Sequence, residues 1–374
     1  MKKQKLSIVL GTVPKASSDM LSQEDVFYPG DVVTGMVTYN PTSNVKYCCV
    51  KIRFTGTVET KVSKIQDQVY VINQQSVLLG NANHENEYVL DEGEYSWPFE
   101  FTLPMQHIPS AGKYRHGSVK YTLVAILSSK GFLGGMQEQK SVKQINIRDL
   151  INCTAAPHVD PVQNSASFNL KPKTNKPKNV ASATVQLGRS AFLPGQQLKV
   201  DIKFVHPAGH SRHPACWLQL IRKERYQAGE NVKEYTHVVA QSCHAININR
   251  EDKMGCLKSF LEIPKDCLYS TSTTKILTVH YHLLVLSDLR TKTGMFEGRN
   301  PSKVTKKLRA KLQSAPGGLE TEIPITIGTL ADVNHAPRVA TCSDIIVWNI
   351  ECFRRNDAYP GASSLNSSTT TTKG

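Results

Sequence analysis

The chain has 374 residues, and its 45 lysine and arginine residues against 31 aspartate and glutamate residues give a formal net charge of +14 at pH 7. This length suggests two or three domains, each large enough to bury a core. The content of hydrophobic (40%), aromatic (7%) and charged (20%) residues is typical of a folded, water-soluble protein and argues against a mainly disordered chain. Its apolar runs are far shorter than the ~20 residues that cross a bilayer.

The amino-terminal segment and the cysteines bear on the cellular compartment. Lys2, Lys3 and Lys5 precede an apolar run over residues 6–13, which is the order of a secretory signal. No small-residue cleavage site follows promptly, so we interpret the run as a first β-strand. Nine scattered cysteines without a C-x-x-C pair favour free thiols in a reducing cytosol. The sequon at Asn152 is the counter-evidence, because it requires a secreted context.

Alternation of apolar and polar residues with a period of two recurs along the chain. It is clear in residues 50–54 and 119–125, and in residues 96–103 every second residue is Trp, Phe, Phe or Leu. Such alternation is typical of strands that bury one face. Glycine and proline separate the runs, and almost no segment has a helical period of ten or more residues. The sequence therefore predicts an all-β chain.

Four segments of the first half return in the same order in the second half: residues 27–37 and 192–202, 101–104 and 261–264, 119–123 and 279–283, and 145–147 and 325–327. The last pair is more widely separated than the pair before it, which predicts an insertion between residues 283 and 325. A repeat with many short strands and turns predicts two tandem β-sandwiches of the immunoglobulin-like kind.

These patterns divide the chain into four parts: a sandwich over residues 1–156, a proline- and lysine-rich linker over 157–180, a second sandwich over 181–334 with a basic insertion at 290–316, and a C-terminal extension with a Ser/Thr-rich tail over 335–374. Proline-rich segments without periodicity behave as linkers, and polar tails without apolar residues are usually disordered.

The ordered motifs of both halves resemble the arrestin family, specifically the α-arrestins or arrestin-domain-containing proteins. These motifs are Tyr-Pro-Gly-Asp-Val-Val-Thr-Gly at 28–35 and the segments 50–56, 95–104, 109–121, 192–195, 261–264 and 322–330. The resemblance covers about residues 1–334. It implies two arrestin-like β-sandwich domains, no catalytic activity and no cofactor.

The resemblance also implies a non-enzymatic adaptor or scaffold in membrane-protein trafficking. Similar proteins bind membrane cargo such as transporters or receptors, and recruit WW-domain ubiquitin ligases through P-P-x-Y motifs to promote endocytosis. This chain has no P-P-x-Y, because none of its prolines is doubled, so we expect a ligase to arrive only indirectly. We expect a cytoplasmic protein that is recruited to the plasma membrane and endosomes. Exposed strand edges and loops, including the one from Tyr226 to Tyr235, are expected to contact a cargo tail.

Sites for chemistry are few. The sequence has no G-x-S-x-G, H-E-x-x-H, Walker or G-x-G-x-x-G motif, so we predict no enzyme. His206, His210, His213 and Cys216 form one metal-like cluster. They fall where the repeat predicts an ordinary loop, so we favour an exposed polar loop and predict no metal site.

Two alternatives remain open at this stage. A secreted or surface two-domain Ig-like adhesion protein would instead show paired cysteines. The Cys48-Cys49 pair invites palmitoylation, but it enters a predicted strand, so we expect packed thiols.

The insertion holds the strongest local charge. Eight cations between Arg290 and Ser314 face only Glu297, and apolar residues recur every four positions, which is the spacing of a helical stripe. A basic amphipathic helix suits an anionic membrane surface, whereas a solvated loop is the alternative. We predict no nucleic-acid partner, since stacking aromatics are missing. The predicted membrane- or anion-binding residues are Arg299, Lys303, Val304, Lys306, Lys307, Leu308, Arg309, Lys311 and Leu312.

Overall fold

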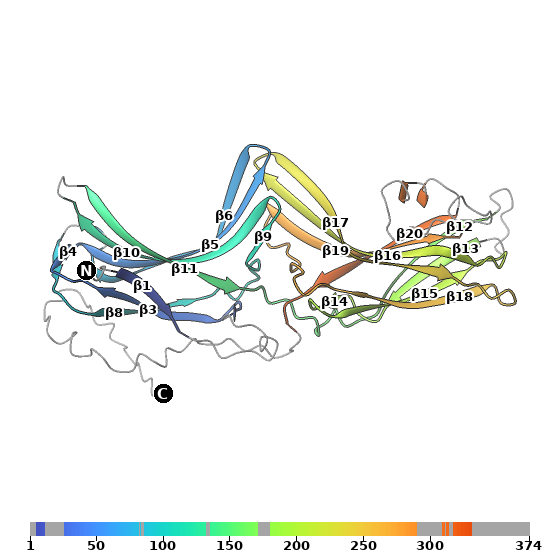
Figure 1. The fold of residues 1–374 in the computed structure, drawn as a ribbon, viewed down its shortest axis with the longest axis horizontal. Helices are drawn as coiled ribbons and strands as arrows, with labels where there is room; N and C mark the ends of the chain where they lie inside the picture. The colour runs from blue at the N-terminus through green and yellow to red at the C-terminus, as the bar shows by residue number, and fades with distance from the viewer. Residues whose placement is uncertain are drawn as a thin grey trace, which may run out of the picture.

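The computed structural model describes residues 5–11, 26–81, 83, 86–131, 135–170, 180–289, 309–310, 312–313 and 317–330. These residues form two β-sandwiches that lie end to end along the long axis of the molecule (Figure 1). The all-β prediction is confirmed. In the part of the chain that the structure describes, no helix has the length and apolar character needed to cross a membrane.

The first sandwich packs a three-stranded sheet on a six-stranded one. The small sheet has the order β1 (Lys5–Leu10), β3 (Val32–Asn40), β8 (Tyr95–Thr102). The large sheet has the order β2 (Val26–Phe27), β11 (Met136–Ile147), β10 (Gly117–Lys130), β5 (Cys49–Val62), β6 (Ile65–Gly80), with β9 (Gly112–Tyr114) paired to β10. A short ladder joins β4 (Val45–Tyr47) to β7 (Tyr88–Leu90). As the alternation predicts, Trp97, Phe99 and Phe101 of β8 face the core.

The second sandwich repeats this plan. One sheet has the order β12 (Val162–Asn169), β13 (Val180–Leu187), β15 (Gln197–Val205), β18 (Met254–Glu262). The other has the order β14 (Ala191–Phe192), β20 (Gly318–Ile327), β19 (Leu277–Asp288), β16 (Arg212–Ala228), β17 (Asn231–Ile246). The linker prediction is wrong for residues 162–169, because β12 pairs antiparallel with β13 over its whole length. Backbone pairing in a sheet outweighs the polar, proline-flanked character of this segment.

The duplication extends to single hydrogen bonds. Tyr121 and Tyr281 hold the same place in the two halves, and their hydroxyl groups donate to the carbonyl oxygens of Pro109 and Leu268, each at 2.6 Å. Each half also contains a short strand that pairs in parallel with a long one, β2 with β11 and β14 with β20. The repeated sequence motifs therefore correspond to repeated pairing.

The repeated Pro-Gly turns use different side chains for one task. In the first half, the Asp31 carboxylate accepts the Tyr28 backbone N–H at 2.9 Å. In the second half, the Gln196 side-chain oxygen accepts the Leu193 backbone N–H at 3.0 Å. The intervening Gly30 and Gly195 have φ values of 86° and 85°, a region in which residues with a Cβ are strained. This requirement explains why the two glycines recur in the repeat.

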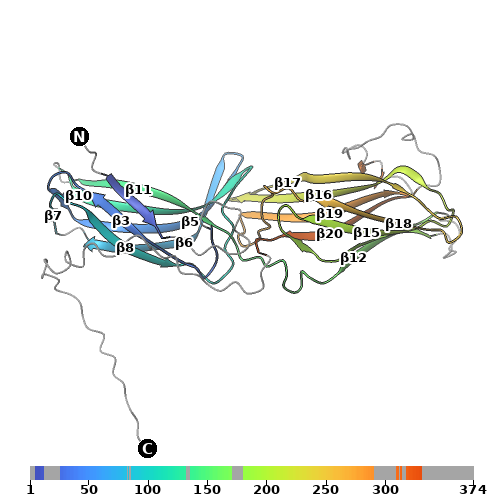
Figure 2. The same ribbon diagram turned by 60° about the horizontal axis from the view of Figure 1, so that its bottom comes forward.

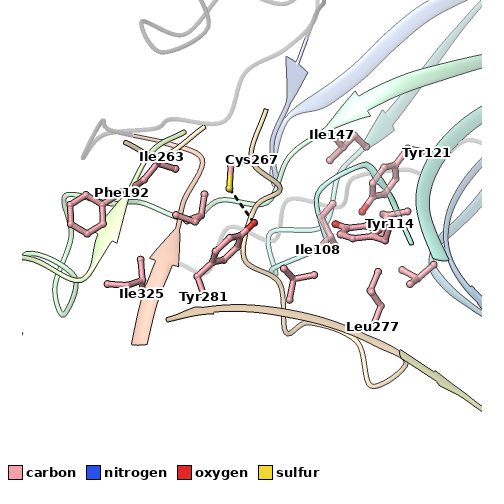
Figure 3. Packing of buried hydrophobic residues seen from close by; sticks show 14 of the residues in the cluster. Ile108, Tyr114, Tyr121, Ile147, Phe192, Ile263, Cys267, Leu277, Tyr281 and Ile325 are labelled. Atoms are coloured by element: carbon pink, nitrogen blue, oxygen red, sulfur yellow. Dashed lines mark hydrogen bonds between the residues drawn. The ribbon is translucent and has the colours of Figure 1, made fainter. Parts of the chain in front are cut away.

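The hydrophobic core continues across the domain junction (Figure 3). Ile108, Tyr114 and Ile147 of the first sandwich belong to the same buried cluster as Leu277 and Tyr281 of the second. Two chain segments also meet there, since residues 149–153 run beside residues 327–330. The Thr329 hydroxyl donates to the Asp149 carbonyl and accepts the Ile151 N–H, and Asn152 bridges to Leu330.

The predicted insertion lies between β19 and β20. The corresponding strands of the first half, β10 and β11, are joined by residues 131–135, whereas β19 and β20 are joined by residues 289–317. This longer loop accounts for the longer sequence separation of the last repeated pair.

Candidate ligand-binding groove

A groove of about 1610 Å³ lies along the first sandwich and reaches the domain junction. Its walls come from β1, β9, β10, β11 and the tip of the β5–β6 hairpin, and Lys233 of β17 adds a side chain from the second sandwich. Among the described residues, strand β1 is an edge strand that pairs with β3 alone. An edge strand carries backbone N–H and C=O groups that are free to pair with another extended chain. The groove therefore combines an open strand edge with side chains from both domains.

The charge of this groove is strongly positive. Glu59 is the acidic residue on its wall, and Lys120 Nζ lies 3.2 Å from the Glu59 carboxylate. The lysine and arginine residues that line it are Lys61, Lys113, Arg115, Lys120, Lys143 and Lys233. All six side chains are exposed. The arrangement attracts an anionic ligand and disfavours a cationic one.

The β9–β10 turn positions the junction end of the groove. Tyr114 ends β9 and is buried, and burial, followed by the nearby charge of Glu224, raises the pKa of its hydroxyl to about 12. Tyr114 therefore stays neutral and acts as a packing residue. Its neighbours Arg115 and His116 form the turn and line the groove.

The Tyr226–Tyr235 hairpin forms the other side of the junction. The His116 ring stacks on Tyr235 with 4.9 Å between ring centroids and meets Tyr226 edge-on at 5.5 Å. The Arg115 guanidinium lies 4.6 Å from the centre of the Tyr235 ring, within the range of a cation–π contact. The expectation that this loop contacts a cargo tail is wrong for Tyr226, which is fully buried against the first sandwich.

A buried charged cluster lies beneath this hairpin. Glu224 is 1% exposed; its carboxylate lies 2.7 Å from Arg222 Nε, and His237 Nε2 is 3.6 Å away. The Tyr226 hydroxyl donates to Glu224, and burial together with this hydrogen bond raises the pKa of Tyr226. A carboxylate this deeply buried requires such partners. The cluster fixes the shape of the hairpin that faces the first sandwich.

The insertion is described at four residues only. Leu312 is 1% exposed and packs on Trp217, Ile221, Leu284 and Leu286. The prediction that Leu312 faces a membrane is therefore wrong in this structure, because the sheet face of β16 and β19 covers its side chain.

Arg309 pairs with Glu320, which also accepts a hydrogen bond from Gln313 at 2.7 Å. This pairing neutralises one of the cations predicted to bind a membrane. The other predicted residues, Arg299, Lys303, Val304, Lys306, Lys307, Leu308 and Lys311, lie outside the residues whose side chains the structure describes.

The four residues of the metal-like cluster do not form one site, although the centroids of the His206 and His210 rings lie 5.5 Å apart. His206 is 1% exposed and its Nε2 lies 3.0 Å from the Leu289 carbonyl oxygen, whereas Cys216 is fully buried in the core. His206 is thus a core residue and not part of an exposed loop. Across the described ranges, no group of three potential ligands could hold a metal ion.

The cysteines are thiols wherever they are described. Cys48 and Cys49 are both fully buried, as the packed interpretation predicts. The seven cysteines among the described residues are free: Cys48, Cys49, Cys153, Cys216, Cys243, Cys256 and Cys267. This pattern does not favour a disulfide-linked surface protein.

Family models match both sandwiches. Residues 17–147 match the arrestin (or S-antigen) N-terminal domain, and residues 177–331 match the arrestin (or S-antigen) C-terminal domain. The chain belongs to the arrestin family. The two matches cover most of the chain in the expected order, which confirms the resemblance seen in its motifs. Arrestin-family proteins are generally non-enzymatic adaptors that bind cargo receptors and trafficking machinery.

The groove is the feature that sequence reasoning missed. Its cations come from different strands, and each is isolated along the chain, so no charge run marks them. The sequence does contain one sign of the groove. In the segments with alternating residues, Lys113 and Lys120 occupy exposed positions that alternate with buried ones.

Proposed function

We propose that this arrestin-family chain is an adaptor that holds an acidic or phosphorylated segment of a membrane cargo's cytoplasmic tail in the cationic groove. The observation that carries the proposal is the six lysine and arginine side chains around a groove with one acidic residue. Phosphate and carboxylate groups form strong, charge-assisted hydrogen bonds with such cations.

The open edge of β1 suits an extended segment. Ile8, Val9 and Leu10 of β1 line the groove, and no described strand pairs with β1 on that side. A tail that adds to β1 as a further strand satisfies the free backbone groups, while its alternating side chains reach the lysines. Backbone pairing gives affinity independent of sequence, and charge selects the acidic tail.

Peptide binding tests the proposal. The probes are a labelled ten-residue peptide with several phosphoserines and the same peptide with serines, compared by fluorescence anisotropy. The triple variant Lys61→Gln, Lys113→Gln, Lys143→Gln removes three exposed cations from the groove, so we expect at least a ~10-fold loss of affinity, corresponding to about 1.4 kcal/mol. Binding also weakens with salt, as the Debye length shortens from about 10 Å at 0.1 M.

A matched control removes the same charge elsewhere. Lys199, Lys203 and Lys258 are exposed on β15 and β18 of the second sandwich, and changing all three to Gln leaves affinity unchanged if the groove is the site. Equal binding of the two peptides, or an equal loss in both triple variants, would overturn the proposal.

The trafficking role follows from this binding. We infer a cytoplasmic α-arrestin-like adaptor, recruited to plasma membrane and endosomes, that supports endocytosis and ubiquitin-linked sorting of its cargo. Because the sequence has no P-P-x-Y, a ubiquitin ligase reaches the cargo indirectly. Isolated WW domains then show no specific binding in a calorimetric titration, and micromolar binding would contradict this part of the proposal.

The basic insertion gives a second contact in the same model. We propose that Lys303, Lys306 and Lys307 attract anionic lipid, since each cation near such a surface adds about 1 kcal/mol. Liposome co-sedimentation tests it: changing the three lysines to Gln reduces pelleting with anionic vesicles and leaves neutral vesicles unaffected. Equal pelleting of both vesicle types would reduce the segment to a solvated loop.

A further inference from the structure

Strand β6 is a long, open edge without charge along most of its length. Within the described residues it pairs with β5 alone and lies at the margin of its sheet (Figure 2). Residues 68–79 contain no charged residue and no proline. Large apolar side chains on this strand are exposed, including Tyr70 at 57%, Val77 at 41% and Val69 at 38%. Edge strands of monomeric proteins are usually protected by charge or proline.

Some other edges of the described sheets carry such protection. Strand β8 contains Pro98 and Glu100, and β18 contains Lys258 and Glu262, whereas β12 has neither charge nor proline and β17 has its two charges, Lys233 and Glu234, near its first residue. Strand β17 is the counterpart of β6 in the second half and has the same length of 16 residues. Lack of charge alone therefore does not distinguish β6 from these strands, and the order of its side chains identifies the partner.

The sequence of β6 is self-complementary in its pattern. Antiparallel pairing of two copies about Gln74 places apolar residues opposite apolar residues in the three outer pairs and polar residues together in the two central pairs, with one mixed pair between them. The pairs are Val69 with Leu79, Tyr70 with Leu78, Val71 with Val77, Ile72 with Ser76, Asn73 with Gln75, and Gln74 with Gln74. In a two-fold symmetric pair, the same strand of both copies forms the contact. A second copy of β6 therefore matches this symmetric pattern of apolar and polar residues.

We infer that this protein forms a two-fold symmetric dimer in which the β6 strands of two copies pair antiparallel about Gln74 and join their six-stranded sheets. The partner is a second copy because no like charges meet across the edge and the exposed side chains of Val69, Tyr70 and Val77 each gain an apolar neighbour. Bulges at residues 71 and 78, where the β5–β6 register shifts, lie almost symmetrically about the same centre. The inference is independent of the cationic groove.

Charge placed at the centre of the edge tests the register. In the double variant Asn73→Glu, Gln75→Glu, two carboxylates face each other at both central pairs of the dimer. Asn73 and Gln75 are exposed in the monomer, and Gln75 lies opposite Arg53, so folding is preserved. Like charges directly opposite destabilise a pair, and we expect the dimer dissociation constant to rise at least about five-fold in sedimentation velocity.

A charge-reversed variant separates pairing from folding. Asn73→Lys, Gln75→Glu places opposite charges at the same two pairs and keeps a glutamate opposite Arg53, so this variant dimerises at least as tightly as the parent. Val238→Glu on β17, where the side chain is 49% exposed, is the matched control on the equivalent edge and leaves the dimer intact. A parent protein that stays monomeric at its highest soluble concentration, or equal effects of all three variants, would overturn the dimer.

Discussion

Strands β5 and β16 occupy the same place in the two sandwiches, because Gly56 lies opposite Tyr121 and Arg222 lies opposite Tyr281. The side chains that follow along the inner face differ sharply. The first half has Gly56, Val58 and Thr60, whereas the second half has Arg222, Glu224 and Tyr226. One backbone arrangement therefore accepts an uncharged row in one domain, in which the Thr60 hydroxyl donates to the Gln227 carbonyl at 2.6 Å, and a buried charged cluster in the other.

This difference separates the residues that form the sandwich from the residues that form the contact between the two domains. The repeated turns and tyrosine hydrogen bonds are present in both halves, so they belong to the sandwich itself. The charged cluster occurs only in the half whose hairpin contacts Arg115 and His116 of the other domain. Burying these charges carries a free-energy penalty for removing them from water. We assign this penalty to the contact between the two domains and not to the formation of the sandwich.

The largest effect we expect comes from breaking the buried pair. Glu224→Leu leaves the Arg222 guanidinium, whose side chain is 22% exposed, without its 2.7 Å partner. Removal of one partner of such a pair destabilises a protein by about 3 kcal/mol or more. Urea denaturation measures the free energy of unfolding.

The double variant sharpens the comparison with the first half. Arg222→Met, Glu224→Leu removes both charges from this row, which is uncharged in β5, so we expect most of the lost stability to return. A double variant as unstable as Glu224→Leu alone would show that the second domain needs the charges for folding itself.

The packing of Leu312 comes next in size. Leu312→Ala leaves a cavity beside Trp217 and Leu284, and we expect a loss of about 2 kcal/mol, since truncation of a buried leucine costs 2 kcal/mol or more. Denaturation followed by tryptophan fluorescence measures it. Val142→Ala, at a side chain 62% exposed on β11, is the control and has almost no effect; an equally small effect of Leu312→Ala would argue that Leu312 leaves the sheet in solution.

The two equivalent tyrosines test how far the halves are alike. Tyr121→Phe and Tyr281→Phe each remove a hydroxyl that donates at 2.6 Å to a carbonyl, so each costs about 1 kcal/mol. Tyr281 also accepts a contact from Cys267 Sγ at 3.3 Å, so its variant loses more. Equal losses in denaturation would contradict a separate role for that contact.

The smallest effect is a pH dependence in the second half. Burial is the main cause that lowers the pKa of His206, and the nearby His210 lowers this pKa further. The hydrogen bond to the Leu289 carbonyl acts in the opposite direction and raises it. The unfolded chain then binds a proton more readily, so stability is full above the ordinary pKa of about 6.5 and is lost as pH falls through it, by at most about 1.4 kcal/mol per pH unit. His206→Gln flattens the unfolding free energy between pH 7 and 5.

A second histidine checks that result. His280 is exposed on β19, so His280→Gln leaves the slope unchanged. A slope that both variants reduce equally would assign the acid sensitivity to charge in general and not to the burial of His206.

Sequence reasoning reached the strands because burial of alternate residues leaves a direct trace, as at Trp97, Phe99 and Phe101. It missed β12. This strand pairs with β13 through backbone hydrogen bonds, and the side chains of this polar segment show no pattern that predicts a strand. It placed the Tyr226–Tyr235 hairpin in solvent, because a contact between domains has no local periodicity.

The cationic groove was not predicted from the sequence for a related reason. Lys61, Lys113 and Lys143 lie on three strands, and only the sheet order brings them together. Charge in the insertion is contiguous along the chain and was therefore noticed, although Leu312 and Arg309 turn toward the protein.

The chain passes the domain junction in two segments, and this has a consequence for dissecting the molecule. Residues 149–153 are bonded to residues 327–330 through Thr329 and the Asn152–Leu330 bridge, and Leu330 also packs on Val26 and Tyr28. The C-terminal end of the second sandwich therefore packs on the first sandwich. A chain severed between Leu170 and Val180 would keep its two pieces together, so the protein could be produced as a split pair that reassembles from separately expressed halves.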